Sequence, residues 1–356
     1  MRSVRAGVPL PSRNRLRSQA RYLLAGVCGL GLLAAAGCGS SGGAGSTVST
    51  TLTIAAVPGV DDAALYLAQK DGLFAAEGLD HVQIKTYTTQ AQVVNAVTAA
   101  QADIGASDYG NVFWTEASQA PDPHRPDLRI LADGYDATAG VLEVLTLPGS
   151  KITSPLSLAN ATVGVPTEGY ISHLKGSGDP TSLDAAAATN VLSDYLGAGA
   201  DSVNWEPMSQ PDEITALKQH TVQAILVSEP YIYQAESQLG AVEVLDACSG
   251  STAGLPLLGY VAMNAWVRQN PAAVADFQAA LAKAQADAAV TGKVQGVLSG
   301  ATGITIQEAD MITIGSYPTS TSVANLQAVV RLMVDQGMID QTNPPAVGPM
   351  VVKPAS

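Results

Sequence analysis

The chain has 356 residues, a length that accommodates two α/β lobes, each with a core of its own. Hydrophobic residues make up 47% of it and charged residues 14%, which excludes an intrinsically disordered chain. Six Arg and no acidic residue precede Cys38, so the rest of the chain carries 12 basic and 31 acidic residues. Because this strongly acidic composition disfavours binding to nucleic acid and to anionic lipid headgroups, we expect no nucleic-acid partner.

The N-terminal segment has the layout of a signal peptide. Arginines are spread over residues 2–21, and residues 22–36 are mostly apolar and small. Because a membrane-spanning helix needs about 20 apolar residues, this run predicts a signal sequence. Cys38 then follows an Ala-Gly pair as in a bacterial lipobox, although Ala35 stands where such boxes most often have Leu. We expect residues 1–37 to be a lipoprotein signal peptide and Cys38 to be lipidated and membrane-anchored; the alternative is an ordinary secretory signal.

Residues 38–51 are rich in Gly, Ser and Thr and predict a flexible tether. Three cysteines occur in the chain, and only Cys248 lies in the body of the mature protein. A disulfide between two cysteines of the body is therefore excluded. We expect Cys248 to be a buried thiol rather than a nucleophile, since no His-rich segment surrounds it.

Alternating strands and helices are predicted after the tether. Residues 52–57 form an apolar strand, and the stretch 61–109 then predicts helix, strand, helix and strand in turn. Its last strand, at 102–106, is short and apolar, as a buried parallel strand would be. This strand delivers Asp108 and Tyr109 to its C-terminal end, the edge at which open α/β sheets bind ligands.

The later elements predict two lobes with two crossings between them. Strands at 128–132 and 141–145 complete the first part of one lobe, which we place at residues 52–147. The second lobe is expected at residues 148–246, and the chain then returns to complete the first lobe at residues 247–356. Strands of the second lobe are predicted at 161–165, 203–205, 222–227 and 241–245.

The order of several motifs resembles a known family. GLFAAEGLD at residues 72–80 precedes a strand, a helix and ADIG at 102–105, and SEPY follows at 228–231. Over about residues 52–340 the chain resembles NMT1/THI5-like solute-binding proteins of the nitrate/taurine/alkanesulfonate and thiamine-pyrimidine-precursor type. The resemblance implies a two-lobed type II periplasmic-binding-protein fold, in which each lobe is a mixed sheet flanked by helices and the ligand cleft lies between the lobes.

The same resemblance implies a function. Such a protein is not an enzyme and needs no cofactor or metal; it captures a small molecule by lobe closure and delivers it to the permease of an ABC importer. We expect a monomer in an extracytoplasmic location. Carried over to this chain, the family's cleft positions give nine ligand-binding candidates: Asp61, Asp62, Asp108, Tyr109, Thr167, Glu168, Tyr170, Glu229 and Tyr231.

The candidate set indicates a class of ligand. Carboxylates and tyrosines dominate it and no Arg or Lys is included, so it favours a neutral or cationic heterocycle over a sulfonate or nitrate. Asp61 and Asp62 are also suited to capping the helix that follows them, and both interpretations stay open. Residues 171–180 are an insertion relative to the family, and they either line the cleft or divert the next helix.

Two other functions remain open. A biosynthetic enzyme can share this fold, but the chain has a single body cysteine and its histidines are scattered: His81, His124, His173 and His220. Only His173 is expected near the cleft. The second alternative is a lipoprotein that senses a ligand or acts as a scaffold without a transporter.

Overall fold

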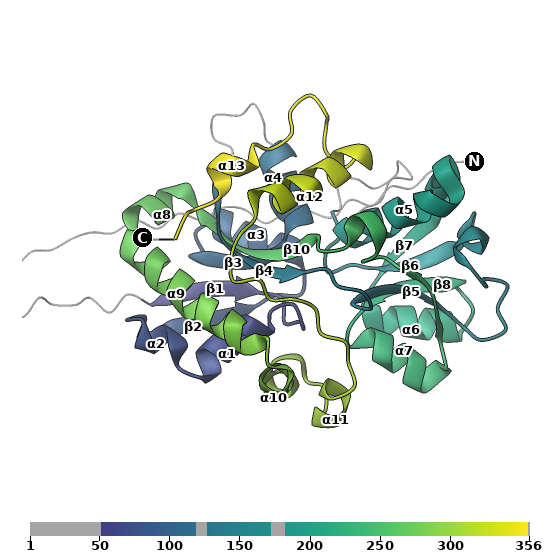
Figure 1. Cartoon of the computed structure of the whole chain (residues 1–356), viewed down its shortest axis with the longest axis horizontal. Coiled ribbons are helices and arrows are strands. Elements are labelled where there is room, and N and C mark those ends of the chain that lie inside the picture. Colours follow the sequence, from purple (N-terminus) through teal and green to yellow (C-terminus); the bar gives the residue numbers. More distant parts are fainter. Residues whose placement is uncertain (1–50, 119–126, 172–181, 355–356) are drawn as a thin grey trace, which may run out of the picture. The chain divides into compact units, whose positions relative to one another are not determined.

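Two five-stranded mixed sheets form the framework of the computed structural model (Figure 1). The structure describes residues 51–118, 127–171 and 182–354, all of which belong to the unit Val48–Ser356. The first sheet has the strand order β2-β1-β3-β10-β4 and the second the order β7-β6-β8-β5-β9. We call each sheet with its helices a lobe. The strands are β1 (Leu52–Ala56), β2 (Val82–Thr86), β3 (Ile104–Asp108), β4 (Leu128–Asp136), β5 (Leu142–Thr146), β6 (Thr162–Pro166), β7 (Asn204–Met208), β8 (Ala224–Ser228), β9 (Val242–Asp246) and β10 (Pro256–Met263).

The two sheets are built in the same way. In the first, β1 pairs in parallel with β2 and β3, and β10 pairs antiparallel with β3 and β4. In the second, β6 pairs in parallel with β7 and β8, and β5 pairs antiparallel with β8 and β9. This arrangement confirms the expected α/β class with two lobes, each containing a mixed sheet.

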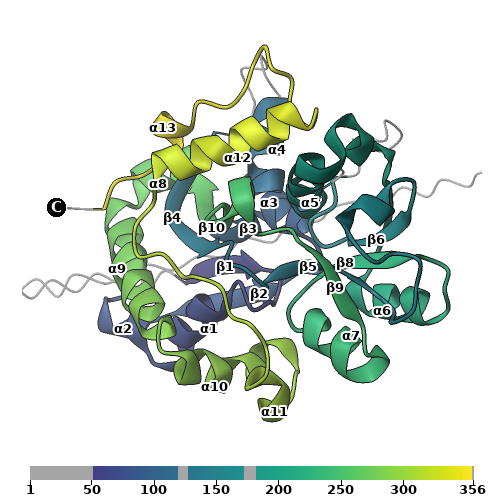
Figure 2. The same ribbon diagram turned by 45° about the vertical axis from the view of Figure 1, so that its right-hand side comes forward.

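Helices cover both faces of each sheet (Figures 1 and 2). On the first sheet, α1, α2, α9 and α10 lie on one face and α3, α4 and α12 on the other; on the second sheet, α5 lies opposite α6 and α7. The helices and short 3-10 turns are α1 (Ala63–Lys70), α2 (Leu73–Ala76), α3 (Gln90–Thr98), α4 (Tyr109–Ser118), η1 (Pro155–Leu158), α5 (Leu183–Leu196), η3 (Gly197–Ser202), α6 (Gln210–Lys218), α7 (Tyr231–Leu239), η4 (Gly250–Thr252), α8 (Asn264–Gln269), α9 (Pro271–Ala288), α10 (Thr291–Thr302), α11 (Ile306–Ala309), α12 (Val323–Asp335) and α13 (Val347–Met350).

The central strands are apolar throughout because both of their faces are buried. In β1, Ile54 and Ala56 belong to the core beneath α1 and α9, whereas Ala55 belongs to the core that contains residues of α3 and α4. All three side chains are 0% exposed. A parallel strand covered on both faces therefore shows a continuous apolar run in place of the alternation seen in half-buried β2.

The first crossing between the sheets lies earlier than the sequence predicted. We expected it after residue 147, at residues 147–150, but β5 already belongs to the second sheet. The crossing therefore occupies residues 137–141, between β4 and β5, and the return crossing lies at residues 247–255, between β9 and β10. The apolar run of β5 is compatible with either sheet, and its antiparallel pairing with the distant β8 and β9 decides its position.

Several predictions fall outside the described residues. These are the signal peptide at residues 1–37, the tether up to residue 50, lipidation of Cys38, and residues 172–180 of the insertion. Within the described residues, no helix is both long enough and apolar enough to cross a membrane.

Candidate functional site

The carboxyl ends of parallel strands in both sheets border one cavity. Its volume is about 330 Å³. From the first lobe it receives the segment after β1, which carries Asp61, and the end of β3, which carries Asp108. From the second lobe it receives Glu168 after β6, and Glu229 and Tyr231 after β8. Five of the nine predicted site residues therefore line this cavity.

The other four predicted site residues do not line the cavity, and Tyr109 is the clearest case. Tyr109 is 0% exposed, its ring stacks on Phe113, and its hydroxyl donates a hydrogen bond of 3.0 Å to Asp133 Oδ1. It lies in the core because α4 begins directly after β3, so that Asp108 and Tyr109 point to opposite sides of the turn. Tyr109 therefore lies outside the lining of this cavity, whereas the family resemblance implied a position in the cleft.

Asp62, Thr167 and Tyr170 are also not among the cavity-lining residues. Asp62 precedes α1, its side chain is 0% exposed, and neither carboxylate oxygen has a hydrogen-bond partner among the described residues. Asp62 occupies the N-cap position of α1, but its side chain accepts no hydrogen bond from the helix. Thr167 and Tyr170 form a turn after β6, with the Tyr170 amide donating to the Thr167 carbonyl, and this turn directs Glu168 to the cavity instead.

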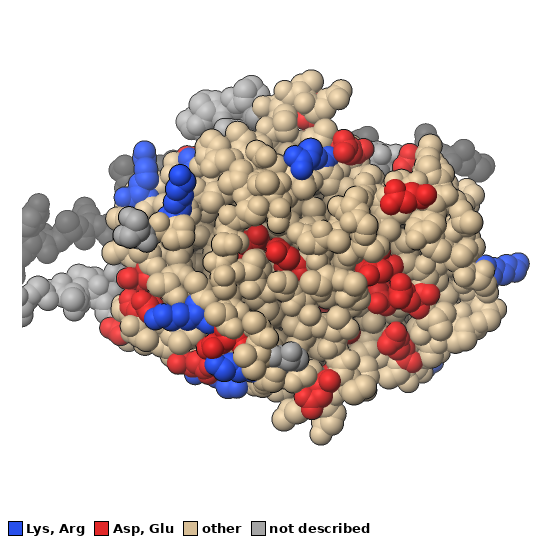
Figure 3. All heavy atoms as spheres, in the orientation of Figure 1, with Lys and Arg blue, Asp and Glu red and all other residues tan. Residues whose placement is uncertain are grey.

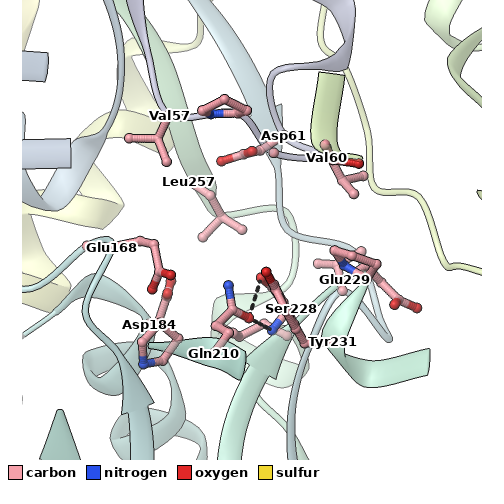
Figure 4. Close-up of a pocket in the computed structure, with 18 of the residues that line it drawn as sticks. Val57, Val60, Asp61, Glu168, Asp184, Gln210, Ser228, Glu229, Tyr231 and Leu257 are labelled. Atoms are coloured by element: carbon pink, nitrogen blue, oxygen red, sulfur yellow. Dashed lines mark hydrogen bonds between the residues drawn. The ribbon is translucent and has the colours of Figure 1, made fainter. Parts of the chain in front are cut away.

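Several cavity residues are not among the nine predicted from the sequence. Asp184, in the first turn of α5, lines the cavity beside Glu168 (Figure 4). Two glutamines take matching positions in the two lobes: Gln90 opens α3 and Gln210 opens α6. Apolar side chains complete the wall, including Val57, Val60 and Leu257 (Figure 4).

The two glutamines perform the same structural role in each lobe. Gln90 Oε1 accepts a hydrogen bond of 3.4 Å from the amide of Asp108, at the end of β3. Gln210 Oε1 accepts one of 3.0 Å from the amide of Ser228, at the end of β8 (Figure 4). A capping Thr or Ser precedes each glutamine, so the repeated Thr-Gln and Ser-Gln pairs were a sequence signal that could have identified them.

Burial raises the pKa of the carboxyl groups of Asp61, Asp108, Glu168, Asp184 and Glu229 at the cavity. Hydrogen bonds with Thr305 lower the pKa of Glu308, which also borders it. The pKa is raised to about 6 for Asp61 and for Asp108, and to about 7 for Asp184 and for Glu229, with desolvation as the largest cause. For Asp184 the neighbouring charges of Asp108, Asp61 and Glu168 add to the effect of burial. Carboxyl groups from both lobes are thus gathered in a cavity that disfavours their ionised forms.

The described residues that line the cavity include no basic group to offset the charge of these carboxylates. Within the described part of the chain, the lining residues include no Lys, Arg, His or Cys. On the face shown in Figure 3, acidic side chains also gather over the second lobe, where Glu143 is repelled by Glu243, Glu236 and Asp246. An anionic ligand would thus enter a site with unfavourable electrostatics.

The carboxylates at the cavity differ in their remaining hydrogen-bonding capacity. Glu229 Oε1 accepts from the amide of Thr313 and its Oε2 from the amide of Tyr233, so this carboxylate is held in place by the backbone. Glu168 Oε2, in contrast, is buried and has no hydrogen-bond partner in the described structure. Glu168 is accordingly better placed than Glu229 to accept a bond from a ligand.

The described cysteine and histidines lie outside the lining of the cavity. Cys248 is 2% exposed, unpaired and not among the lining residues, and burial raises the pKa of its thiol. His81 and His220 are exposed and also lie outside the lining, while His124 and His173 are outside the described residues. Over residues 51–118, 127–171 and 182–354, no group of three or more His, Cys, Asp or Glu side chains could hold a metal ion.

Comparison with known proteins shows that this architecture occurs in other solved structures. Two binding proteins and one enzyme are among the solved structures that share it at low sequence identity. The periplasmic aliphatic sulphonate binding protein SsuA from Escherichia coli is 15% identical, with a TM-score of 0.65 over 86% of this chain and 93% of that one. The periplasmic nitrate-binding protein NrtA from Synechocystis PCC 6803 is 14% identical, with a TM-score of 0.62 over 82% and 83%. The desulfurization enzyme DSZB is 18% identical, with a TM-score of 0.62 over 85% and 96%.

These likenesses confirm the type II periplasmic-binding-protein fold. A comparison with curated proteins finds no match. The profile of the family described as NMT1/THI5 like matches residues 60–291, which is more than half of the chain. The protein therefore belongs to the NMT1/THI5-like family.

Proposed function

We propose that this protein is an extracytoplasmic solute-binding protein that captures a small polar molecule by lobe closure and delivers it to an ABC importer. The observation that carries the proposal is the position of the cavity, which is bordered by strand ends of both lobes. A ligand held there contacts both lobes at once, so its binding energy can stabilise a closed arrangement. The likeness to a sulphonate-binding and a nitrate-binding protein supports the same function.

The solute we favour is a neutral or cationic heterocycle. The carboxylates of Asp61, Glu168 and Asp184 can accept N–H hydrogen bonds, and Tyr231 offers an aromatic surface beside them (Figure 4). Sulfonates and nitrate are disfavoured because no lining residue within the described part of the chain carries a positive charge. The ligand class proposed for this chain therefore differs from the solutes named for SsuA and NrtA.

The remaining parts of the proposal concern the N-terminal segment and the partners. We propose that residues 1–37 are removed as a signal peptide, that Cys38 carries the lipid anchor, and that residues 38–51 tether a monomeric binding unit to the membrane. The acidic composition after Cys38 is compatible with a permease partner and with a lipid attached covalently, since neither requires a basic surface. Radiolabelled palmitate incorporation that disappears in Cys38→Ala would test the anchor.

A thermal-shift screen tests the binding function. The polypeptide from Ser40 onward contains the whole unit Val48–Ser356 and would be screened against pyrimidines, thiamine, riboflavin, purines, polyamines, taurine, alkanesulfonates and nitrate. A ligand present at about 100 times its Kd adds about 2.7 kcal/mol of stability, which raises the Tm by several degrees. A shift with a cationic or heterocyclic compound is the expected result; a shift with sulfonates alone would keep the binding function and overturn the proposed ligand class.

An enzyme is the second candidate, because the desulfurization enzyme DSZB has the same fold. The absence of Cys and His from the described cavity lining is the observation against nucleophilic catalysis by those groups. Incubation of each stabilising compound with the protein, followed by mass spectrometry, separates the two candidates. Recovery of the compound unchanged is expected, whereas time-dependent conversion would identify an enzyme. If the compound binds but its uptake is the same in cells without the protein, the function is sensing or scaffolding.

A further inference from the structure

Four carboxylates from the two lobes face one another across the cavity. We call them the acidic junction: Asp61 and Asp108 of the first lobe, and Glu168 and Asp184 of the second. Figure 4 shows Asp61 on one wall of the cavity and Glu168 with Asp184 on the opposite wall. A Cβ atom placed on Gly169 would lie 4.0 Å from Asp108 Oδ2, so the two lobes approach closely here.

The lobes are hydrogen-bonded to each other beside this junction. The amide of Gln90 in α3 donates a bond of 2.7 Å to the carbonyl of Glu168. Asn111 Nδ2 in α4 donates one of 3.1 Å to the carbonyl of Gly169, while also donating to Asp108. The structure is therefore a closed arrangement, and closure itself brings the four carboxylates together.

Further acidic side chains surround the acidic junction and add to its negative charge. Asp62 follows Asp61 in the chain and the two carboxylates repel each other, while Glu213 of α6 interacts unfavourably with Glu168 and Asp184. The titratable groups that interact with Asp184 from the other elements are the remaining members of the junction, Glu213 and the buried thiol of Cys248. Glu168 Oε2 is buried without a hydrogen-bond partner in the described structure, which leaves an acceptor to be satisfied from the cavity.

Helix N-termini do not make the junction suitable for an anion. Asp108 caps α4 by accepting from the amide of Asn111 at 2.8 Å, and Asp184 occupies the first turn of α5. The positive ends of both helices thus already face carboxylates of the chain itself. A bound anion would have to displace them or add to their charge.

We propose that the solute carries a cationic nitrogen group, such as an ammonium, amidinium or guanidinium, that is bound at the acidic junction, and that its positive charge is what permits the lobes to close. This proposal rests on the proposed function and adds the charge of the ligand and its role in closure. Without a ligand, repulsion between the carboxylates of the two lobes opposes the closed arrangement. A cation bonded to both pairs converts that repulsion into attraction, and a neutral solute of the same shape does not.

Small-angle X-ray scattering on the ligand-free polypeptide from Ser40 onward tests the closure without knowledge of the natural ligand. We expect the radius of gyration to be larger at pH 8 than at pH 5, because protonation at the junction replaces the missing cation. In the double variant Glu168→Gln, Asp184→Asn it should be small at both pH values. Glu143→Gln removes a buried acid outside the cavity and should behave like the natural protein. A double variant that keeps the larger radius at pH 8 would overturn the proposal.

A matched pair of compounds tests the ligand charge. Benzamidine and benzamide have nearly the same shape, and only benzamidine is a cation. At pH 8 benzamidine should reduce the radius of gyration of the natural protein, with an affinity about tenfold or more above that of benzamide, as expected for a charged hydrogen bond in a buried site. Asp184→Asn should remove most of this difference. Benzamidine acting no more strongly than benzamide would count against the junction.

The failure of this proposal can be told apart from the failure of the proposed function. A solute from the thermal-shift screen that is uncharged and binds with the same affinity at pH 8 and pH 5.5 would leave the binding protein standing and overturn the cationic junction. Conversely, if the double variant closes as expected but no solute is captured, the closure mechanism holds and the transport function fails.

Discussion

Asp108 and Tyr109 are consecutive residues whose side chains lie in different surroundings. Asp108 borders the cavity, whereas Tyr109 donates a hydrogen bond to the buried Asp133. We predict that Tyr109→Phe lowers the free energy of unfolding by about 1–3 kcal/mol, because Asp133 loses a donor in the core. The affinity for any captured solute should not change. Urea unfolding and isothermal titration measure the two quantities.

Tyr195→Phe is the matched control, since Tyr195 is 53% exposed and its loss of a hydroxyl should leave both quantities unchanged. If Tyr109→Phe weakened solute binding without affecting stability, Tyr109 would be a ligand contact after all, as the family resemblance implied.

The sequence predicted the strand ends at the cavity more accurately than it predicted which individual side chains line the cavity. The ends of β1, β3, β6 and β8 were expected there, and each contributes a lining residue. Adjacent positions could not be separated, because the direction of Asp108 and of Tyr109 depends on how sharply the chain turns from β3 into α4. Asp184 was missed for another reason: it enters from the start of α5 and not from a strand end.

Strand β10 approaches α4 closely, and a glycine makes that approach possible. A Cβ atom added to Gly259 would lie 2.1 Å from Tyr109 Oη, too close for any contact. We predict that Gly259→Ala destabilises the protein by about 1–3 kcal/mol through overpacking of the first lobe. Its m-value in urea should stay the same, because the unfolded chain exposes the same surface.

Gly300 in α10 provides the opposite case, because a Cβ atom there meets nothing within 4 Å. Gly300→Ala should therefore raise the unfolding free energy by about 0.5–1 kcal/mol, as expected for an unstrained helix interior. Equal effects of the two substitutions would show that β10 and α4 can separate without cost.

Local patterns identified the elements but not all of their partners. The apolar runs of β1, β3 and β8 predicted buried strands, and the strands are there. The run at 141–145 also predicts a strand, which the sequence places in the first lobe, whereas β5 belongs to the second sheet. Which sheet a strand joins depends on pairing with residues far away in sequence, and β5 pairs with β8 and β9, which follow it by about 80 to 100 residues.

At the scale of the whole molecule, the buried carboxyl groups predict an unusual pH dependence of stability. In the folded state the pKa is about 6 for Asp61 and Asp108 and about 7 for Asp184 and Glu229, above the ordinary 3.8 and 4.5 of Asp and Glu. The folded state therefore binds more protons than the unfolded state between about pH 4 and pH 7. Stability is then lost as the pH rises through these values and regained as it falls.

We predict that the ligand-free protein is more stable at pH 5.5 than at pH 8, by on the order of 2 kcal/mol. One pKa unit corresponds to about 1.4 kcal/mol, and screening by solvent in the cavity reduces the contribution of each group. Urea unfolding at the two pH values measures the difference, and Asp184→Asn should reduce it because one of the raised groups is gone. A cationic ligand at saturation should reduce the difference as well, since it stabilises the ionised carboxylates and so binds more tightly at pH 8. A protein equally stable at both pH values would mean that the cavity carboxylates are solvated in the open arrangement, and that they are desolvated only when the lobes close.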